Sequence, residues 1–205
     1  MSILNRAFFL KSAACLKQLP STGFPEICFI GKSNSGKSTA INSLTNKHSL
    51  AFSSKTPGCT KLINLFDLTI KSQNSKNFQG YLVDLPGYGY AKISWKEKNK
   101  IEKLINNYLC YRKFIVGIVL LIDIRRGITV LDKKLIKLIS SYNRSILILL
   151  SKADKVSYNE QTNAIFSIKN SLGNTINIEK IIPFSSKNHI GLKEAIQCIT
   201  DWFLK

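Results

Sequence analysis

The sequence predicts an α/β fold in three layers: a mostly parallel six-stranded sheet with one antiparallel strand, and helices on both faces. Short apolar runs of strand length alternate along the chain with amphipathic helical stripes, which is the pattern of βαβ units. A polar stretch at 71–77 joins two strand-like runs without a helix, so we expect that pair to be antiparallel. Folds of this class bind ligands at the carboxyl ends of the strands.

In the first half, residues 1–25 form an N-terminal segment that we expect to pack on the edge of a domain spanning 26–205, with turn residues just before the first strand. A polar loop at 49–60 separates the first helix from the second strand. The remaining elements expected here are strands at 27–30, 62–70 and 81–84 and a helix at 39–46.

In the second half, Ser94-Trp95-Lys96-Glu97 has the spacing of a capping box. It opens a helix whose apolar stripe runs from Ile101 to Leu109 with period 3.6. The rest of the chain alternates between strands at 115–122, 146–150 and 178–183 and helices around 131–138, 165–172 and 192–203.

The composition fits one globular domain. The chain has 205 residues, 44% of them apolar, and no uninterrupted apolar run of the ~18 residues that a membrane span needs. The N-terminus lacks the layout of a signal peptide. The five cysteines include no C-x-x-C pair, which favours reduced thiols. We expect a cytoplasmic protein without a membrane span.

The charge is strongly positive: 30 Lys and Arg against 12 Asp and Glu give a formal charge of +18. An AT-rich genome would explain many lysines, but it would not explain the shortage of acids. We therefore favour a polyanion, a nucleic acid, as the partner. An anionic membrane is disfavoured, since no basic helix with a broad apolar face stands out.

The stretch from Gly31 to Ser38 reads G-x-x-x-x-G-K-S, the P-loop motif, and lies between a predicted strand and a predicted helix, as the motif requires. Its glycines let backbone N–H groups surround phosphate oxygens, and the helix N-terminus adds positive potential. Lys37 is expected to reach the β- and γ-phosphates. The Ser38 hydroxyl is expected to ligate Mg²⁺, which prefers oxygen ligands.

Two further segments are expected to face the γ-phosphate. Asp84-Leu85-Pro86-Gly87 ends the third strand, so that Asp84 can hold magnesium through water and the Gly87 N–H can meet the γ-phosphate. In the loop after the first helix, Thr60 is the expected threonine that closes the magnesium shell. Thr56 is the rival, and the spacing to the next strand favours Thr60.

The base is expected to be guanine. Ser151-Lys152-Ala153-Asp154 follows the fifth strand and fits an [N/T]-K-x-D pattern with serine first. The Asp154 carboxylate can accept from both N1–H and the N2 amine, a donor pair that adenine lacks. Lys152 can cover the base with its stem. Phe184-Ser185-Ser186 follows the last strand and can offer N–H groups to guanine O6.

These motifs, in this order, resemble the Era/TrmE-like group of TRAFAC GTPases. Within that group, Lys55-Thr-Pro-Gly-Cys-Thr60, Leu62-Ile-Asn64 and Asp84-Leu-Pro-Gly-Tyr-Gly-Tyr-Ala91 are similar to the EngB (YihA/YsxC) family over essentially the whole chain. Cys59 stands where the family usually has arginine, which puts a basic contact there in doubt. Ser151 replaces the usual threonine and keeps its hydroxyl.

The resemblance implies a GTPase that needs Mg²⁺, binds GTP and GDP, and acts in assembly of the large ribosomal subunit, with a link to cell division and septation. It implies catalytic roles for Lys37, Thr60 and Gly87, and magnesium contacts for Ser38, Thr60 and Asp84. The implied nucleotide-binding residues are Gly31, Lys32, Ser33, Asn34, Ser35, Gly36, Lys37, Ser38, Gly58, Cys59, Thr60, Lys61, Leu62, Asp84, Leu85, Pro86, Gly87, Ser151, Lys152, Ala153, Asp154, Phe184, Ser185 and Ser186.

Two residues bear on the rate of hydrolysis. Many small GTPases place glutamine directly after Asp-x-x-Gly to orient water, whereas this chain has Tyr88 there, so we expect slow hydrolysis. Asn34 resembles the asparagine that ligates potassium in related GTPases, where the cation replaces an arginine finger. Whether Asn34 holds potassium or only shapes the loop stays open.

Three functions remain in competition. The first is a GTP-dependent switch, expected to be monomeric, that binds ribosomal RNA or a precursor of the large subunit. The second is a small-molecule kinase, which 151–154 argues against. The third is a regulatory module at the division site without direct RNA binding. For the first, the expected RNA surface is a set of basic residues in and around the helix that begins near Ser94: Lys92, Lys96, Lys98, Lys100, Lys103, Arg112, Lys113, Arg125, Arg126, Lys133, Lys134 and Lys137.

Overall fold

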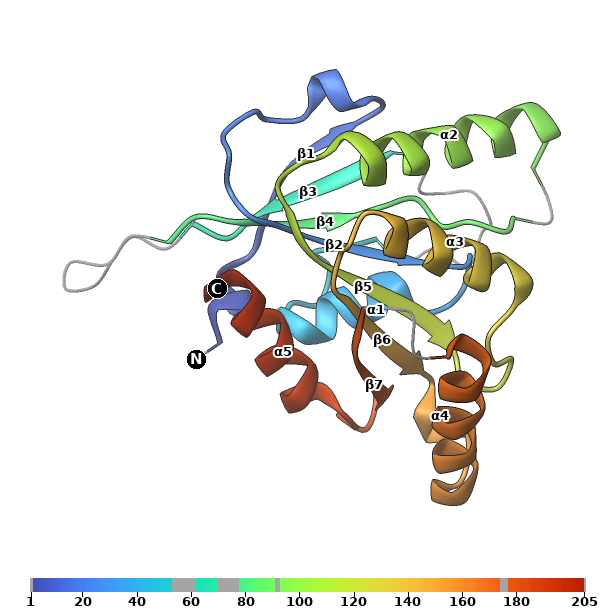
Figure 1. The fold of residues 1–205 in the computed structure, drawn as a ribbon. Coiled ribbons are helices and arrows are strands. Elements are labelled where there is room, and N and C mark those ends of the chain that lie inside the picture. The colour runs from blue at the N-terminus through green and yellow to red at the C-terminus, as the bar shows by residue number, and fades with distance from the viewer. Residues whose placement is uncertain (1, 53–61, 70–77, 91–92, 174–176, 205) are drawn as a thin grey trace.

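The chain forms a seven-stranded sheet with helices on both faces (Figure 1). A computed structural model describes residues 2–52, 62–69, 78–90, 93–173 and 177–204. The strand order is β1-β3-β4-β2-β5-β6-β7, and β2, β4, β5, β6 and β7 pair in parallel. The strands are β1 (Phe8–Ala13), β2 (Glu26–Gly31), β3 (Ile63–Asp67), β4 (Tyr81–Asp84), β5 (Ile115–Asp123), β6 (Ile146–Ser151) and β7 (Ile178–Phe184).

The prediction of the fold class is confirmed, but the expected count of six strands is wrong. The additional strand is β1, which lies at the sheet edge and pairs antiparallel with β3. Since β3 is also antiparallel to β4, β3 alone runs against the others, as expected. Strand β1 escaped prediction because its side chains do not alternate in burial: Phe8 and Phe9 are 50% and 53% exposed.

A β-bulge interrupts the pairing of β1 with β3. Phe9 lies opposite Phe66 and Lys11 lies opposite Leu65, so Leu10 has no partner residue on β3. The rings of Phe9 and Phe66 meet edge to face with centroids 6.2 Å apart. The N-terminal segment is therefore joined to the sheet by backbone pairing and by this ring contact.

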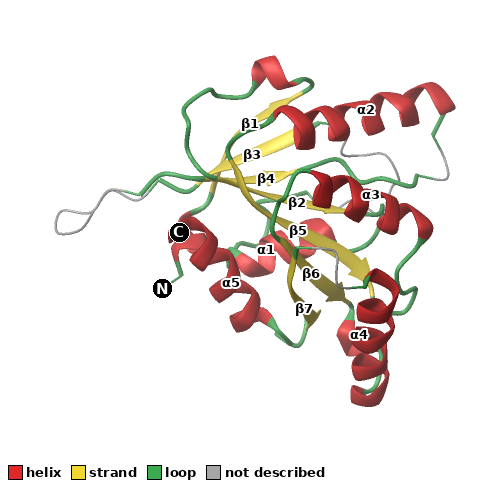
Figure 2. Cartoon of the chain, in the orientation of Figure 1, coloured by secondary structure: helices red, strands yellow, loops and turns green. Residues whose placement is uncertain are grey.

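Five α-helices make the outer layers (Figures 1 and 2). Helices α2, α3 and α4 cover one face of the sheet, and α1 and α5 cover the other. Within the described residues no helix combines the length and apolarity needed to cross a membrane. The helices are α1 (Lys37–Leu44), α2 (Trp95–Tyr111), α3 (Val130–Ser141), α4 (Tyr158–Leu172) and α5 (Leu192–Leu204).

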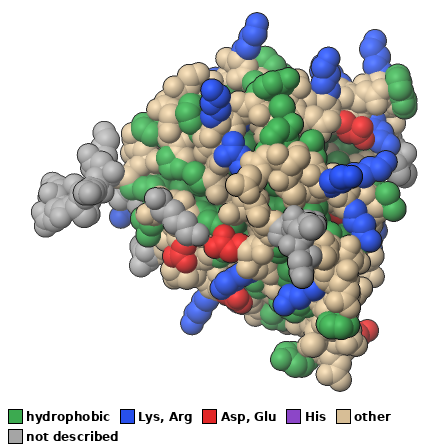
Figure 3. Space-filling view, viewed as in Figure 1, with side chains coloured by type: hydrophobic (Ala, Val, Ile, Leu, Met, Phe, Trp, Pro, Cys, Tyr) green, Lys and Arg blue, Asp and Glu red, His purple; other side chains and the backbone are tan. Residues whose placement is uncertain are grey.

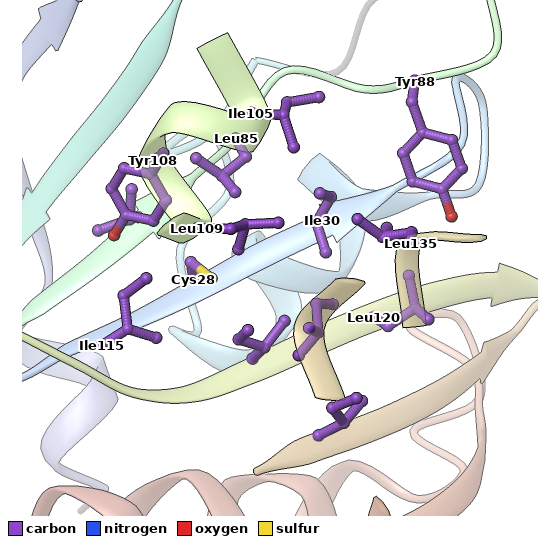
Figure 4. Close-up of a cluster of buried hydrophobic side chains, with 14 of the residues drawn as sticks. Cys28, Ile30, Leu85, Tyr88, Ile105, Tyr108, Leu109, Ile115, Leu120 and Leu135 are labelled. Carbon is purple, nitrogen blue, oxygen red and sulfur yellow. The ribbon is translucent and has the colours of Figure 1, made fainter. Parts of the chain in front are cut away.

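The parallel strands supply a core on each face because successive side chains point to opposite sides. In β2, Cys28 and Ile30 face the core under α2 and α3 (Figure 4), whereas Ile27 and Phe29 face α1 and α5. All four residues have no exposed surface. The strand that leads into the following loop is therefore packed on both faces.

A buried polar cluster corrects one part of the expected basic surface. Arg112, at the end of α2, is only 8% exposed, and its Nε donates to both oxygens of the buried Glu26 carboxylate at 3.0 Å. Tyr108 Oη donates to the same carboxylate at 2.7 Å. Burial and the neighbouring Glu26 charge raise the pKa of Tyr108. Arg112 is thus a structural cation and does not contribute to an RNA-binding surface.

Candidate functional site

The loop from Gly31 to Ser38 connects β2 to α1 with the backbone geometry of an anion cradle. Asn34 and Gly36 have φ values of 65° and 86°, and such left-handed residues turn consecutive N–H groups toward one point. A Cβ on Gly31 would lie 2.5 Å from Ser35 Oγ and 2.8 Å from the Leu121 carbonyl oxygen, so this position admits only glycine. The first-turn N–H groups of α1 have no helical acceptor and suit phosphate oxygens.

Lys37 and Asp84 form a buried ion pair at this end of the sheet. Lys37 begins α1 and Asp84 ends β4, the strand directly beside β2, where it lies in register with Phe29. Lys37 Nζ donates to Asp84 Oδ1, and both side chains are almost completely buried. Asn64 Nδ2 approaches the other oxygen, Oδ2, at 3.5 Å. The pair places a cation for phosphate and a carboxylate for a hydrated metal at one spot.

The residues around the loop fit a magnesium ion. Ser38, in the first turn of α1, and Asp84 supply the oxygen ligands that Mg²⁺ prefers. The buried Ser35 Oγ has no hydrogen-bond partner in the described part of the chain, so a polar atom in the same loop is left for a ligand or water. Bound there, Mg²⁺ would neutralise phosphate charge. Ser38 would ligate it directly, and Asp84 would hold it through water.

The segment 151–154 follows β6 and is fixed to the P-loop by two hydrogen bonds. Ser151 Oγ donates to the Ser35 carbonyl at 2.6 Å, and Lys152 Nζ donates to the Asn34 carbonyl at 2.9 Å. Lys152 has a positive φ of 62°, which brings its side chain back over the loop. The expected base-binding and phosphate-binding segments therefore lie together, although 115 residues of sequence separate Gly36 from Ser151.

Asp154, the predicted guanine acceptor, is oriented by Ser185. Ser185 Oγ donates to Asp154 Oδ1 at 2.8 Å and accepts the backbone N–H groups of Lys187 and Asn188 at 3.2 Å. The hydrogen bond from Ser185 is the main reason that the pKa of Asp154 lies below its ordinary value. The carboxylate is thus ionised at neutral pH, with Oδ1 held by the loop that was predicted to meet guanine O6.

Of the other predicted residues, Lys32, Ser33 and Ser186 are half-buried, and the rest divide into three groups. Leu85, Pro86, Ala153 and Phe184 are buried, and Leu85 and Phe184 belong to the two cores, so these positions shape the site from behind. Leu62 is 40% exposed. The predicted residues Gly58, Cys59, Thr60 and Lys61, with the rival Thr56, lie outside the described residues, and so does Lys92 of the basic surface.

The loop after β4 returns to the P-loop through Tyr88. Ser33 N–H donates to the Tyr88 carbonyl at 2.9 Å, and Tyr88 N–H donates to the Gly31 carbonyl at 3.2 Å. The neighbouring Gly87 is packed so closely that a Cβ would lie 3.4 Å from the Gly31 carbonyl oxygen. Gly87 is therefore positioned beside the P-loop, as its predicted phosphate contact requires.

The Tyr88 ring belongs to the buried cluster that Figure 4 shows, and it lines a pocket with Ile105 of α2 and Leu135 of α3. Its hydroxyl donates to the buried carboxylate of Asp132, which also accepts from Thr129 N–H and Oγ1 at the start of α3. Burial and the Asp132 charge raise the pKa of Tyr88. The Tyr88 hydroxyl is therefore neutral, and its hydrogen is donated to Asp132.

Sequence reasoning missed Asp123, which ends β5 beside the predicted base segment. Asp123 Oδ2 accepts from Lys152 Nζ at 2.8 Å and from Arg125 Nη2 at 2.7 Å, and Oδ1 accepts from Arg125 Nε at 2.9 Å. Burial alone would raise the pKa of Asp123, but the hydrogen bonds from Arg125 and Lys152 hold it well below its usual range. An apolar strand run that ends in aspartate, as at Asp84, was the available signal.

Replacing Asp123 by asparagine should weaken GTP binding about fivefold at pH 7, because Lys152 loses the anion that holds its amine near the Asn34 carbonyl, and Lys152 is one-third exposed. Fluorescence titration with labelled GTP measures this loss. Because its folded-state pKa is lowered, Asp123 contributes stability above pH ~4 that is lost as the pH falls through the folded pKa, so the variant's unfolding free energy should depend less on pH there.

Glu194→Gln is the matched control, since Glu194 is an exposed acid whose ion pair is with Lys180 and not with a residue of the predicted site. If the Asp123→Asn variant bound GTP as tightly as the unmodified chain, Asp123 would have no role in nucleotide binding.

Comparison with known proteins supports the assignment that the geometry suggests. The family model described as "50S ribosome-binding GTPase" matches residues 26–152. A probable GTP-binding protein EngB from Bordetella pertussis is 50% identical over 202 residues, which cover 98% of this chain and 97% of that protein. The corresponding protein of Thiobacillus denitrificans is 43% identical and covers 98% and 92%.

Solved structures show the same fold at lower identity. A crystal structure of a probable GTP-binding protein engB matches with a TM-score of 0.65 and 23% identity, over 87% of this chain and 98% of that one. Aquifex aeolicus Era bound to GDP·AlF4⁻ matches with a TM-score of 0.70 and 22% identity, over 86% and 56%. On the full-length sequence similarity and the P-loop geometry together, the chain belongs to the EngB family of GTP-binding proteins.

Proposed function

We propose that this chain is a cytoplasmic, monomeric switch that binds GTP with Mg²⁺, hydrolyses it slowly and acts in assembly of the large ribosomal subunit, on which normal cell division and septation depend. Residues 26–205 carry the nucleotide site, and residues 1–25 pack on it. Lys37, Gly87 and Thr60 act on the γ-phosphate, and Ser38, Thr60 and Asp84 serve the magnesium ion. The remaining predicted residues hold the phosphates and the guanine.

The proposed role in assembly of the large ribosomal subunit rests on the surface charge. All 12 acidic residues are described, and four of them, Glu26, Asp84, Asp123 and Asp132, are buried. Lysine and arginine side chains are spread over the top and right of the face formed by α2 and α3 (Figure 3). Such a surface fits the phosphate backbone of RNA. The name of the matching family model, a GTPase that binds the 50S subunit, supports the same partner.

The exposed lysines of α2 are the central part of that surface. Lys96, Lys100 and Lys103 are exposed, whereas Ile101, Ile105 and Tyr108 of the same helix are buried. Helix α2 begins at Trp95, seven residues after Tyr88 of the loop that also carries Gly87. Ordering that loop around the γ-phosphate would fix the direction of these lysines, so binding to the subunit should be tighter with a non-hydrolysable GTP analogue than with GDP.

Replacing Lys96, Lys100 and Lys103 by glutamine should weaken binding to large subunits or their precursors and flatten its salt dependence, because fewer counterions are released. Co-sedimentation across a salt series with the GTP analogue measures both quantities. The matched control is the triple Lys47, Lys169 and Lys193 to glutamine, which removes the same charge from exposed positions in other elements. An equal salt slope in the two triple variants would exclude α2 as an RNA contact.

The alternative, a module at the division site without RNA binding, is tested by the same sedimentation. It would be favoured if the chain stayed in the supernatant at every salt concentration in both nucleotide states. The described residues favour RNA, since α2 and α3 both carry exposed lysines and cover the same face of the sheet.

Slow hydrolysis is proposed because Tyr88, in the usual place of a water-orienting glutamine, is buried and bonded to Asp132. Asn34 is exposed at the rim of the P-loop, where a potassium ion could neutralise charge between the β- and γ-phosphates. Single-turnover hydrolysis should then be about tenfold faster in potassium than in sodium, and Asn34→Ala should abolish the difference. Equal rates in the two salts would leave Asn34 with a role only in loop shape.

A further inference from the structure

A groove separates α2 from α3 on the basic face, with a volume of about 310 Å³. Its apolar lining consists of Tyr88, Ile105 and Leu135, which are labelled in Figure 4, and of Leu131 and Leu138 from α3. Its rim is polar and carries Glu102 and Asn106 from α2 and Lys134 from α3. We call this feature the α2–α3 groove.

The groove has the chemistry that a nucleobase needs. Apolar and aromatic walls receive the faces of a planar base, and side chains such as asparagine and glutamate pair with donors and acceptors at base edges. A volume near 300 Å³ is at the small end of ligand pockets and exceeds that of a single base. The negative charge of Glu102 disfavours a phosphate at the rim of α2 and suits an amino group of a base.

Positive charge surrounds the groove on the side of α3. Lys133, Lys134 and Lys137 are exposed, whereas the only acid of that helix, Asp132, is buried and occupied by Tyr88 and Thr129. The phosphates on either side of an inserted base would therefore meet lysines of α3 and of α2. Trp95, the first residue of α2, is 78% exposed, and an exposed indole ring can stack on a further base.

We propose that the α2–α3 groove receives an unpaired nucleotide of an RNA single strand or loop: the base enters between the helices and its flanking phosphates lie on the lysines. This inference rests on the proposed RNA partner and specifies which structural form of RNA is bound. Duplex RNA would not suffice, because its stacked bases cannot enter a groove between two helices.

The same groove is linked to the nucleotide site through one residue. Tyr88 forms part of the groove lining, while its backbone N–H and carbonyl pair with Gly31 and Ser33 of the P-loop. Gly87, the proposed γ-phosphate contact, directly precedes it. A shift of this loop with nucleotide state would change the shape of the lining. By linkage, RNA in the groove would then change the affinity for GTP relative to GDP by the same factor as GTP changes the affinity for RNA.

The experiment fills the groove. Asn106→Phe places a bulky ring at the exposed rim without changing the charge, and Asn163→Phe on α4 is the matched control at another exposed asparagine. Binding to large subunits, or to RNA extracted from them, is measured by sedimentation and filter retention with the GTP analogue present, and thermal melting checks folding. Asn106→Phe should bind at least about tenfold more weakly, as expected for the loss of one stacked base, with its salt slope nearly retained.

A photo-reactive benzophenone side chain at Lys137, one turn from the groove, identifies the occupant. Adducts that map to a single-stranded nucleotide support the proposal. Adducts to a ribosomal protein, or to nothing while binding persists, overturn it even if Asn106→Phe fails to fold. Unchanged affinity in a folded Asn106→Phe variant also overturns it. If the unmodified chain itself binds no RNA and no subunit, the proposed function fails, and that result is distinct from the failure of the groove alone.

Discussion

Replacing Asp154 by asparagine is expected to weaken GTP binding about 100- to 1,000-fold and to strengthen binding of xanthosine triphosphate. The carboxylate would accept from N1–H and from the N2 amine of guanine, and each hydrogen bond to a charged group is worth about 1.5–3 kcal/mol. The side-chain amide of asparagine would place an N–H donor opposite the N2 amine of guanine, which is also a donor. Xanthine has a carbonyl oxygen at that ring position, and this oxygen can accept from the asparagine. Ser185 still holds the other side of residue 154 in place, so the change acts on the base and not on the loop.

Competitive titration with the two nucleotides measures this exchange of specificity. Asp201→Asn is a suitable control, because Asp201 is an exposed acid on α5 whose contact is with Gln197. A Ser185→Ala variant should lose a smaller part of the GTP affinity, since it disturbs only the orientation of Asp154. If Asp154→Asn bound GTP as tightly as the unmodified chain, the assignment of guanine to this segment would be wrong.

Replacing Lys37 by alanine should have two separate effects. It removes the cation expected to meet the phosphates, so nucleotide affinity should fall by at least about 100-fold. It also leaves the fully buried Asp84 carboxylate without its charged partner, which should destabilise the fold by about 3–5 kcal/mol. A loss of nucleotide binding alone would therefore not distinguish a binding role from partial unfolding.

The double variant Lys37→Ala with Asp84→Asn separates the two effects. Removing both charges should restore most of the unfolding free energy, because no unpaired charge stays buried, whereas nucleotide binding should not return. Urea unfolding without nucleotide gives the stability, and fluorescence titration gives the affinity. A double variant as unstable as Lys37→Ala would contradict the ion-pair argument, and one that binds GTP normally would contradict the role of Lys37.

Elements could be predicted from the sequence where their local residue pattern matches their burial in the fold. The buried parallel strands β2, β5 and β6 are continuous apolar runs, and Ser94 caps α2 by accepting the Glu97 N–H, so their positions could be predicted. Strand β1 could not, because an edge strand with both faces exposed has no period-2 pattern. Arg112 was misjudged because sequence does not show that Glu26, 86 residues away, lies beside it.

The candidate site shows the same division. Motifs indicated which residues gather at the P-loop, since each motif follows a strand and parallel strands end at one edge. The sequence did not reveal three contacts: Lys152 with the Asn34 carbonyl, Asp123 with Lys152, and Tyr88 with Asp132. These depend on side-chain directions set by the whole fold and not by spacing along the chain.

The bulge in β1 bears on how the chain avoids self-association. An outermost strand has backbone groups that a second copy could pair with, and Phe8, Phe9 and Leu10 would make that pairing favourable. Pairing between two edge strands requires a regular, uncharged strand. The irregular register at Leu10 and the exposed Lys11 that follows it make β1 unsuitable for such pairing. The segment that joins the N-terminus to the sheet therefore also carries features that oppose pairing between copies of the chain.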